Sequence, residues 1–583
     1  MPNNKPSSGG ALTFDLVGQP WIQVLRSDGS EDELPLDQVF AQAGQLRGVL
    51  GDLVTQEFAL VRLLLAVAHD ALDGPVDIEE WADLWEDLDC FAPVRAYLEE
   101  HRERFDLLHP VTPFFQTPGL RTAKDEVFSL NRIVADVPAG EPFFSARLPD
   151  VGRLTFAEAA RWIVHVHAYD TSGIKTGMVD DDRVRGGKVY PLGTGWAGGL
   201  GGVFVEGRTV RETLLLNLVA ADTEELDFSA DDRPAWRREP CGPGSDGRSA
   251  TGLRDLYTWQ SRRVRLHHDG DGVHGVVLGY GDPLASRNKH RLEPMTSWRR
   301  SPAQEKKLGQ SPVYLPLEHD PARSAWRGIV ALLADRLEET SSTEGPLRLR
   351  PRILEWVARL VTEGHLSRRF LVRARVAGVR YGTQQSVVDE VVDDRLVMPV
   401  VMLHAQDPTY AQQAISAAED ADRAVRVLGD LAADLARATG SEEEGPKSAA
   451  RAEGFDALDQ PYRDWLSAMA EVVDPFEHRD TWQRQVRQTV GRLGDRLVAA
   501  AGDAAWEGRI HSDNKGGTLW LNASLADVWF RARLTRALGD PGSPGSPSSG
   551  EGDATFGDDG PHTPQPTPSS DTDDAVTASE VHA

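Results

Sequence analysis

The sequence predicts an α+β protein: a large, irregular, mixed α/β N-terminal domain over residues 1–395, a C-terminal four-helix bundle over 396–540, and a disordered acidic tail over 541–583. Three observations support this prediction. A chain of 583 residues is too long for one compact core. Short apolar stretches broken by Gly and Pro fill most of the first part, and long amphipathic segments fill the second. Hydrophobic and charged residues make up 40% and 26% of the chain, which is ordinary for a globular protein.

Two segments near the N-terminus have clear patterns. Residues 12–24 cluster apolar side chains around a Gly and a Pro, which predicts a strand and a turn. Residues 55–72 are rich in apolar residues and begin at Thr55, which predicts a buried helix with Thr55 as its N-cap. From about 100 to 395, Gly and Pro interrupt the pattern so often that we expect an irregular domain with functional loops.

After residue 396 the sequence becomes helical. Apolar side chains repeat at helical spacing in four segments, which cover residues 408–438, 455–472, 479–501 and 519–538. Short polar connections join these segments, so they predict a four-helix bundle. Of the last 43 residues, 20 are Pro, Gly or Ser. Such a segment buries too little apolar surface to fold, and the tail is therefore expected to be disordered.

Composition excludes several classes of protein. No apolar run reaches the roughly 18 residues that span a bilayer. The N-terminus lacks the basic and then apolar pattern of a secretory signal. Cys90 and Cys241 are the only cysteines, so neither a disulfide framework nor a cysteine zinc site is expected. We therefore expect a cytoplasmic protein with no membrane partner and no metal.

The charge is unevenly distributed. A net charge of −27 argues against a general affinity for nucleic acid. The tail holds eight acids and neither Lys nor Arg, whereas residues 348–380 hold nine arginines and only two acids, Glu355 and Glu363. This distribution predicts one side that faces a polyanion. A solvated face, or ion pairing of these arginines within the chain, is the open alternative.

A glycine-rich segment, Gly193-Thr194-Gly195-Trp196-Ala197-Gly198, matches the GxGxxG pattern of dinucleotide-binding loops. Such a loop opens a helix whose N-terminus faces the pyrophosphate. Here the segment continues through further glycines into Val203-Phe204-Val205, which is typical of a strand. We therefore expect no nucleotide cofactor. The remaining interpretations are a flexible turn and a loop that another backbone or a sugar-phosphate can approach closely.

Side chains alternate along residues 370–376, which predicts a half-buried strand with Arg373 and Arg375 on a basic outer face. A tight connection bracketed by Gly378 and Gly382 follows. It places four polar side chains at or just after a turn, namely Thr383, Gln384, Gln385 and Ser386. Amides at such a turn can donate to and accept from base edges in a DNA groove. An ordinary hairpin tip is the alternative.

Other patterns carry less information. His267-His268-Asp269 runs into a turn signal, which favours an exposed hairpin over a metal or nuclease site. In the third bundle segment, Arg484, Arg492 and Arg496 share a polar stripe that either solvates the bundle or contacts phosphate. The chain contains none of the GxSxG, HExxH or Walker motifs, so no catalytic residue is expected.

Four segments follow one another in a recognisable order. They are Phe14-Asp15-Leu16 with Pro20-Trp21-Ile22, His109-Pro110 with Phe114-Phe115-Gln116-Thr117, Val205-Glu206-Gly207 leading into Thr213-Leu214-Leu215-Leu216-Asn217, and Leu256-Tyr257-Thr258-Trp259-Gln260-Ser261-Arg262-Arg263. Together with a mixed domain followed by a bundle, over about residues 12–538, they resemble the CasA family. CasA is the large subunit of Cascade, the type I-E CRISPR surveillance complex.

The resemblance implies a non-catalytic subunit that recognises the protospacer-adjacent motif (PAM) of double-stranded DNA from the minor groove and starts strand separation for guide RNA pairing. It implies a wedge at Thr383-Gln384-Gln385, with Gln384 inserting. It implies a glycine loop at Gly193-Thr194-Gly195, with Ser172-Gly173 as the alternative. The basic minor-groove residue would be Lys289, with Arg287 nearby.

The resemblance also implies partners. Phe143-Phe144-Ser145 would dock on the guide RNA handle and the other Cascade subunits. Arg484, Arg492 and Arg496 would contact the displaced single strand, and a separate helicase-nuclease would be recruited. Two different functions remain open: a nucleotide-dependent enzyme built around the glycine-rich segment, and a generic single-stranded nucleic-acid-binding protein that uses the arginine stretch.

Overall fold

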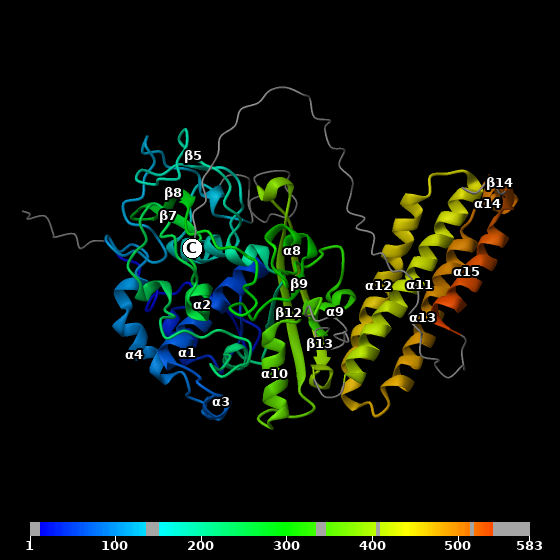
Figure 1. Ribbon diagram of the computed structural model, residues 1–583, viewed down its shortest axis with the longest axis horizontal. Helices are drawn as coiled ribbons and strands as arrows, with labels where there is room; N and C mark the ends of the chain where they lie inside the picture. Colours follow the sequence, from blue (N-terminus) through cyan, green and yellow to red (C-terminus); the bar gives the residue numbers. More distant parts are fainter. Residues whose placement is uncertain (1–11, 136–150, 334–345, 404–407, 513–517, 540–583) are drawn as a thin grey trace, which may run out of the picture. The chain divides into compact units, whose positions relative to one another are not determined.

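The computed structural model describes residues 12–135, 151–333, 346–403, 408–512 and 518–539. Within them a mixed α/β part precedes a helical part (Figure 1), which confirms the predicted α+β class. The described residues up to Leu538 belong to one compact unit. The proposed docking segment Phe143-Phe144-Ser145 and the predicted tail lie outside the described residues. No helix in the described ranges is long and apolar enough to cross a membrane.

Helix α2 (Val54–Leu72) is the centre of the N-terminal core. Its own apolar side chains point to nearly all sides of the helix, and almost every residue of the helix is buried. It packs against α4 (Ala92–Glu100), α5 (Phe156–Tyr169) and α7 (Leu253–Tyr257). The predicted helix is confirmed, but its predicted N-cap is wrong. Thr55 lies inside the first turn, where its hydroxyl is 2.9 Å from Nε2 of His165 on α5.

Small sheets and short helices surround this core. The predicted N-terminal strand is β1 (Ile22–Arg26), the middle strand of an antiparallel sheet with β2 (Glu31–Leu34) and β3 (Leu46–Val49). Histidines 267 and 268 lie in the hairpin of β7 (Arg262–Asp269) and β8 (Gly272–Tyr280), as predicted. The other short elements are α1 (Leu36–Ala41), α3 (Ile78–Glu86), β4 (Lys175–Thr176), β5 (Lys188–Val189), α6 (Val210–Asn217), α8 (Pro302–Leu308) and α9 (Val330–Leu333).

Two further sheets position the candidate site. A long hairpin of β12 (Leu371–Tyr381) and β13 (Val388–Pro399) pairs on its β12 edge with β6 (Gly202–Val205). A smaller antiparallel sheet has the order β10-β9-β11, formed by β9 (Trp298–Arg300), β10 (Tyr314–Pro316) and β11 (Arg348–Leu349). Helix α10 (Arg352–Thr362) follows β11 directly and is buried along one side.

The helical part contains four long helices among the described residues, and Figure 1 shows them side by side. They are α11 (Thr409–Thr439), α12 (Glu444–Ala468), α13 (Pro475–Ala499) and α15 (Ala523–Leu538). Helix α11 contacts the other three. The last helix starts later than predicted, because the short helix α14 (Asp503–Glu507) and a hairpin of β14 (Arg509–Ser512) and β15 (Thr518–Leu521) precede it. The predicted boundary at 395/396 falls inside β13.

The buried histidines of α5 predict acid sensitivity. Burial lowers the pKa of His165 to about 3 and that of His167 to about 4. The unfolded chain protonates these rings near pH 6.5, whereas the folded chain holds them neutral. Their contribution to stability is therefore complete above pH 6.5 and is lost as the pH falls toward 4.

We expect His165→Gln, whose amide can still bond Thr55, to reduce the loss of unfolding free energy between pH 7 and pH 5 by up to about 2 kcal/mol. Urea denaturation at each pH measures this difference. The exposed His274, changed to Gln, is the matched control. An equal pH dependence of the His165 variant and the wild type would contradict the neutral, buried state of His165.

Candidate nucleic-acid interface

The tip of the β12–β13 hairpin presents the predicted wedge residues. Thr383–Gln385 forms a single 3-10 turn, and all three side chains are exposed. Gln384 and Gln385 both have a φ of 55°, in the left-handed region that costs energy for a residue with a Cβ. Gly378 lies inside β12, opposite Val392, so the prediction that it brackets the turn is wrong. The hairpin therefore holds two amides outward in a strained turn at the end of a long ladder.

A pocket of about 240 Å³ opens beside this tip. Its lining includes Gln385 and all of Gly193-Thr194-Gly195. The structure thus brings together two loops that are almost two hundred residues apart in the sequence. The rest of the lining comes from residues beside the glycine segment, from Trp259, Ser261 and Arg262 at the start of β7, from the end of β8 and the segment after it, from β9, and from β10 and Glu318.

The alternative glycine site, Ser172-Gly173, lies between these two loops. The backbone N–H of Ser172 donates to the Gln385 carbonyl at 2.7 Å, and the Ser172 hydroxyl accepts from the Gly193 N–H at 3.1 Å. A Cβ on Gly173 would meet nothing closer than the Ser386 side chain at 3.7 Å. Gly173 is therefore an open glycine at the hairpin tip.

Gly193 and Gly195 are explained by the fold itself. Gly193 has a φ of +108°, which strains any other residue. A Cβ on Gly195 would lie 2.4 Å from the carbonyl of Ala168 at the end of α5. The backbone that lies close to this loop is therefore that of the end of α5, and not that of a ligand. Of the two glycine segments, Gly193-Thr194-Gly195 lines the pocket, and Ser172-Gly173 contacts the hairpin tip directly.

One buried arginine, Arg262 at the start of β7, ties these loops together. Its side chain is 2% exposed, and its guanidinium pairs with the carboxylate of Asp170. The same group donates to the carbonyls of Thr171 at 3.0 Å and Gly193 at 2.9 Å. Lys175 contacts Asp170 at 2.6 Å. Burial raises the pKa of the Asp170 carboxyl, but Lys175 and Arg262 outweigh it and hold the pKa below its ordinary value.

The other end of the glycine-rich segment is fixed to α2. Trp196 donates from Nε1 to Glu293 at 2.8 Å. Glu293 accepts two hydrogen bonds from Arg62, at 2.9 and 2.8 Å, and both side chains are buried. A buried pair of this kind costs several kcal/mol to break on one side only, because the remaining charge is left uncompensated.

The nucleotide-cofactor alternative is contradicted by this geometry. After Gly195 the chain makes only the 3-10 turn Trp196–Gly199 and then enters β6. A Cβ on Gly198 would lie 2.1 Å from the Tyr381 hydroxyl, so this glycine accommodates the hairpin. No α-helix begins at the described loop, and a pyrophosphate would meet no helix N-terminus there.

The predicted basic residues of the interface lie in the segment between β8 and β9. Ser286 of this segment lines the pocket, Arg287 is exposed and Lys289 is half-buried. Asn288 fixes the segment to β10, because its N–H donates to the Tyr314 carbonyl at 2.9 Å. Sequence reasoning missed Arg299, which also lines the pocket and is exposed on β9. Its alternation with buried Trp298 was the available signal.

Arg375 corrects the prediction of a basic outer face on β12. It is 3% exposed and lies within 4 Å of three carboxylates, those of Glu57, Glu206 and Asp393. The reason is tertiary: β6 covers one edge of β12, and α2 packs on the hairpin. Burial raises the pKa of Glu57 to about 7, although Arg375 acts against this shift. Arg373 is half-buried and makes no ion pair within the described ranges.

Most of the arginine stretch is likewise neutralised within the chain. Ion pairs with carboxylates occupy Arg350, Arg352, Arg359, Arg369 and Arg380. The alternative of intramolecular pairing therefore accounts for most of the local positive charge.

The bundle arginines lie apart from the pocket. Arg484, Arg492 and Arg496 are exposed on α13, which packs against α11, α12 and α15. Arg496 pairs with Glu453 of α12 at 2.7 Å. None of the three lines the pocket.

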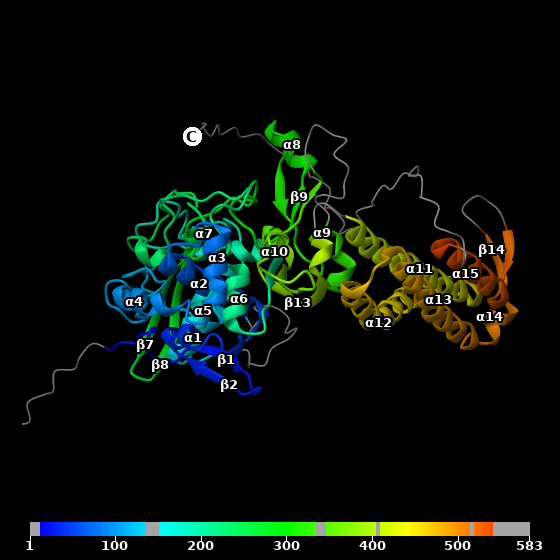
Figure 2. The ribbon, with the colours of Figure 1, turned by 90° about the horizontal axis from the view of Figure 1, so that it is seen from below.

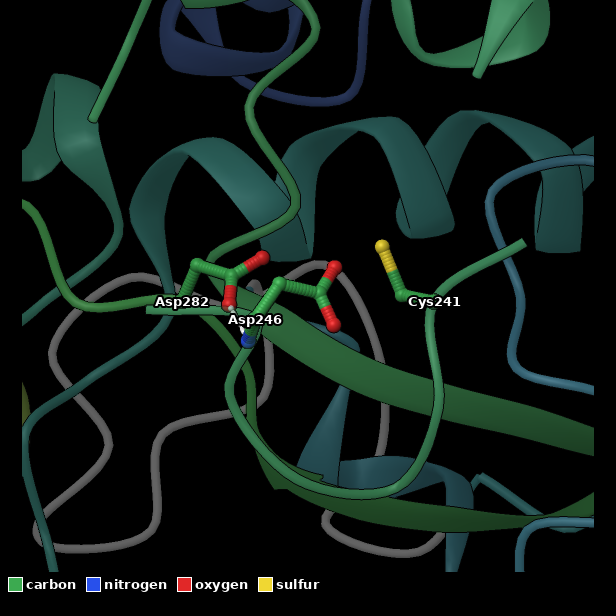
Figure 3. Close-up of side chains that lie close together, drawn as sticks. All are labelled: Cys241, Asp246 and Asp282. Atoms are coloured by element: carbon green, nitrogen blue, oxygen red, sulfur yellow. Dashed lines mark hydrogen bonds between the residues drawn. The ribbon is translucent and has the colours of Figure 1, made fainter. Parts of the chain in front are cut away.

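One cluster offers side chains of the types that bind metals. Cys241, Asp246 and Asp282 place one potential ligand atom each within 4.8 Å of one another (Figure 3). Arg263 already supplies positive charge here, 3.1 Å from Asp282 and 4.0 Å from Asp246. Burial raises the pKa of the Cys241 thiol to about 11, which disfavours the thiolate that metals prefer.

Comparison with known proteins places this geometry in a family. A sequence model of the family described as CRISPR-associated protein Cse1 matches residues 15–493. The curated CRISPR-associated protein CasA/Cse1 of Thermus thermophilus is 29% identical over 364 residues, with 58% of this chain covered. That match spans 65% of the relative's own length.

Solved structures agree over a longer span. The crystal structure of Thermobifida fusca Cse1 is 55% identical, covers 90% of this chain and 98% of that one, and superposes with a TM-score of 0.83. Cse1 from Acidimicrobium ferrooxidans is 32% identical, with coverage of 91% and 98% and a TM-score of 0.76. A chain of a structure described as a CRISPR RNA-guided surveillance complex is 20% identical over 83% of this chain, with a TM-score of 0.62, and shows the fold alone. The chain therefore belongs to the CRISPR-associated protein Cse1 family, whose members are also named CasA.

Proposed function

We propose that this chain is a non-catalytic, cytoplasmic subunit of a Cascade-type CRISPR RNA-guided surveillance complex, and that it recognises the PAM of double-stranded DNA and starts strand separation. One observation carries the proposal. The exposed amides of Gln384 and Gln385, the open glycine at 173 and a pocket with basic residues meet at one place. Membership of the Cse1 family, and a fold shared with a chain of a surveillance complex, support it.

The hairpin has the mechanical properties of a wedge. Its strands pair from Leu371 with Pro399 to Tyr381 with Val388, and the Tyr381 hydroxyl donates to the Tyr169 carbonyl at 2.6 Å. The tip is therefore supported from behind and from the side. A rigid tip can insert into the minor groove and unstack a base step, at a cost of a few kcal/mol that guide RNA pairing then offsets. Gln384, at the outer point of the turn, is the inserting residue in this proposal.

Recognition of the motif would come from the minor groove. Gly173 and the adjacent pocket would receive the groove edge, and Lys289 would contribute the positive charge. The minor groove distinguishes A·T from G·C pairs and little more. We therefore expect the chain to accept several different motif sequences.

The remaining partners are proposed on the family resemblance. Phe143-Phe144-Ser145 would dock on the guide RNA handle and the neighbouring subunits. Arg484, Arg492 and Arg496 would contact the displaced strand with their exposed guanidinium groups. A helicase-nuclease would act on the opened target. The generic single-strand binder loses support, because ion pairs occupy most of the arginine stretch on which it depends.

Gln384→Ala tests the wedge. We expect the assembled complex to open the first target base pair about tenfold more slowly, because the substitution removes the inserting amide and leaves the ladder intact. A fluorescent base analogue at that pair measures opening, and gel filtration checks assembly. Gln485→Ala, an exposed glutamine on α13, is the matched control. Equal opening rates for the Gln384 variant and the wild type would contradict the wedge assignment.

Arg262→Lys tests the support of the recognition loops. Lysine keeps the charge but cannot donate to Asp170, Thr171 and Gly193 at once. We expect the ratio of affinities for motif-bearing and motif-lacking duplex to fall about tenfold, since misplaced loops lose hydrogen bonds worth about 1 kcal/mol each.

Arg161→Lys is the matched control for stability. Arg161 is equally buried and donates to the carbonyl of Trp21 and the carboxylate of Glu33, neither of which lines the pocket. We expect the two variants to lower the melting temperature similarly and only the Arg262 variant to lose discrimination. A discrimination ratio that falls equally in both would show a general loss of structure instead.

A further inference from the structure

The sheet β10-β9-β11 presents two arginines side by side on one face. In the ladder, Arg299 of β9 lies directly opposite Arg348 of β11 on one side and Leu315 of β10 on the other. Opposed residues of neighbouring strands share a face. Trp298 faces the other way and packs with Tyr314 and Leu349. The two guanidinium groups therefore point together away from that small core. Figure 2 shows β9 beside α8.

Like charges directly opposite each other destabilise a strand pair. Within the described ranges, neither Arg299 nor Arg348 forms an ion pair, although the chain provides carboxylates for the arginines next to them. Arg300 pairs with Glu305 at 2.6 Å, and Arg350 pairs with Glu355 at 3.1 Å. Among the described residues, carboxylates therefore offset the charges of Arg300 and Arg350, whereas the repulsion between Arg299 and Arg348 is not offset by an ion pair.

One exposed acid, Glu318, lies near Arg299 without forming an ion pair with it within the described ranges. Glu318 lines the same pocket as Arg299. Burial raises the pKa of its carboxyl, and the positive charge of Arg299 only partly opposes that shift. The positive charge of the arginine pair is therefore available to an external anion.

The pair continues a basic edge of the pocket. Arg299 and Leu315 both line it, and the Asn288 contact with Tyr314 places Arg287 and Lys289 next to β10. Within the described part of the chain, neither Arg287 nor Lys289 has a carboxylate partner. Basic groups thus extend from the pocket across the sheet to β11.

We propose that Arg299 and Arg348 form a binding site for the phosphate backbone of double-stranded DNA that flanks the recognised motif. The inference rests on the proposed function and adds the residues that hold the duplex against the pocket. Guanidinium groups suit phosphate because their N–H groups are arranged as a fork.

Duplex is favoured over a single strand by the character of this face. Proteins that hold single strands stack bases on exposed aromatic rings. Here the aromatic residues of the sheet, Trp298 and Tyr314, are buried on its other side. Phosphate contacts carry no sequence information, so this site would set affinity and register, and the hairpin tip would supply discrimination.

The test is Arg299→Gln with Arg348→Gln in the assembled complex, with a duplex extending beyond the motif as the probe. We expect affinity near 0.15 M salt to fall about tenfold or more for motif-bearing and motif-lacking duplex alike. The slope of log affinity against log salt should decrease by about 2, because two phosphate contacts are lost. Arg426→Gln with Arg531→Gln, two exposed arginines of the bundle, removes the same charge elsewhere.

The outcomes separate this inference from the proposed function. If the wild type discriminates the motif while the double variant keeps its affinity and salt slope, the inference is overturned and the proposed function stands. If the double variant loses affinity and salt slope while the wild type binds motif-bearing and motif-lacking duplex equally, the arginine site stands and the proposed recognition of the motif fails. An equal loss on a probe whose flank is single-stranded would overturn the assignment to duplex.

Discussion

The buried pairing of Arg262 with Asp170 is the interaction on which the candidate interface depends. An ion pair this deep is stable only when every remaining donor is satisfied. Arg262 meets that condition with the carbonyls of Thr171, Gly193 and Ser261, which belong to three separate segments. Because the buried Arg262 guanidinium needs all of these partners, it holds the three segments in a single arrangement. Lys175 adds a second cation to the Asp170 carboxylate.

Around that pair, the end of α5 and the segment after it support both the glycine loop and the hairpin tip. Tyr169, the last residue of α5, and Ser172 after it offer backbone groups to the hairpin, and Asp170 offers its carbonyl to the glycine loop. Glycine is required where these contacts are closest, at Gly195 and Gly198. A displacement of either loop would break hydrogen bonds of the other. The glycine loop and the hairpin tip are in this sense one structural unit, although they come from distant parts of the sequence.

Tertiary contacts also determine where the molecule presents free positive charge. The arginine-rich stretch of this acidic chain presents little free positive charge, because arginines such as Arg375 and Arg350 are buried in ion pairs with neighbouring carboxylates. The exposed arginines at the pocket edge are a small remainder. An acidic background with a restricted basic edge favours one orientation of a polyanion and disfavours general adhesion to nucleic acid.

The sequence by itself determined the fold class, the central buried helix, the four long bundle helices and the strand leading to the glutamine turn. These are properties of local periodicity, and short-range patterns such as those of 55–72 and 370–376 encode them directly. Family resemblance placed Gln384 and offered two glycine segments. Only the tertiary structure decided between neighbours with the same local pattern. Arg373 and Arg375 alternate identically, yet Arg375 is buried because α2 and β6 happen to cover it. Arg299 and Arg348 are unremarkable until the ladder sets them opposite each other. Burial and cross-strand pairing arise from contacts between segments far apart in the chain, and local sequence carries no record of which segments will meet.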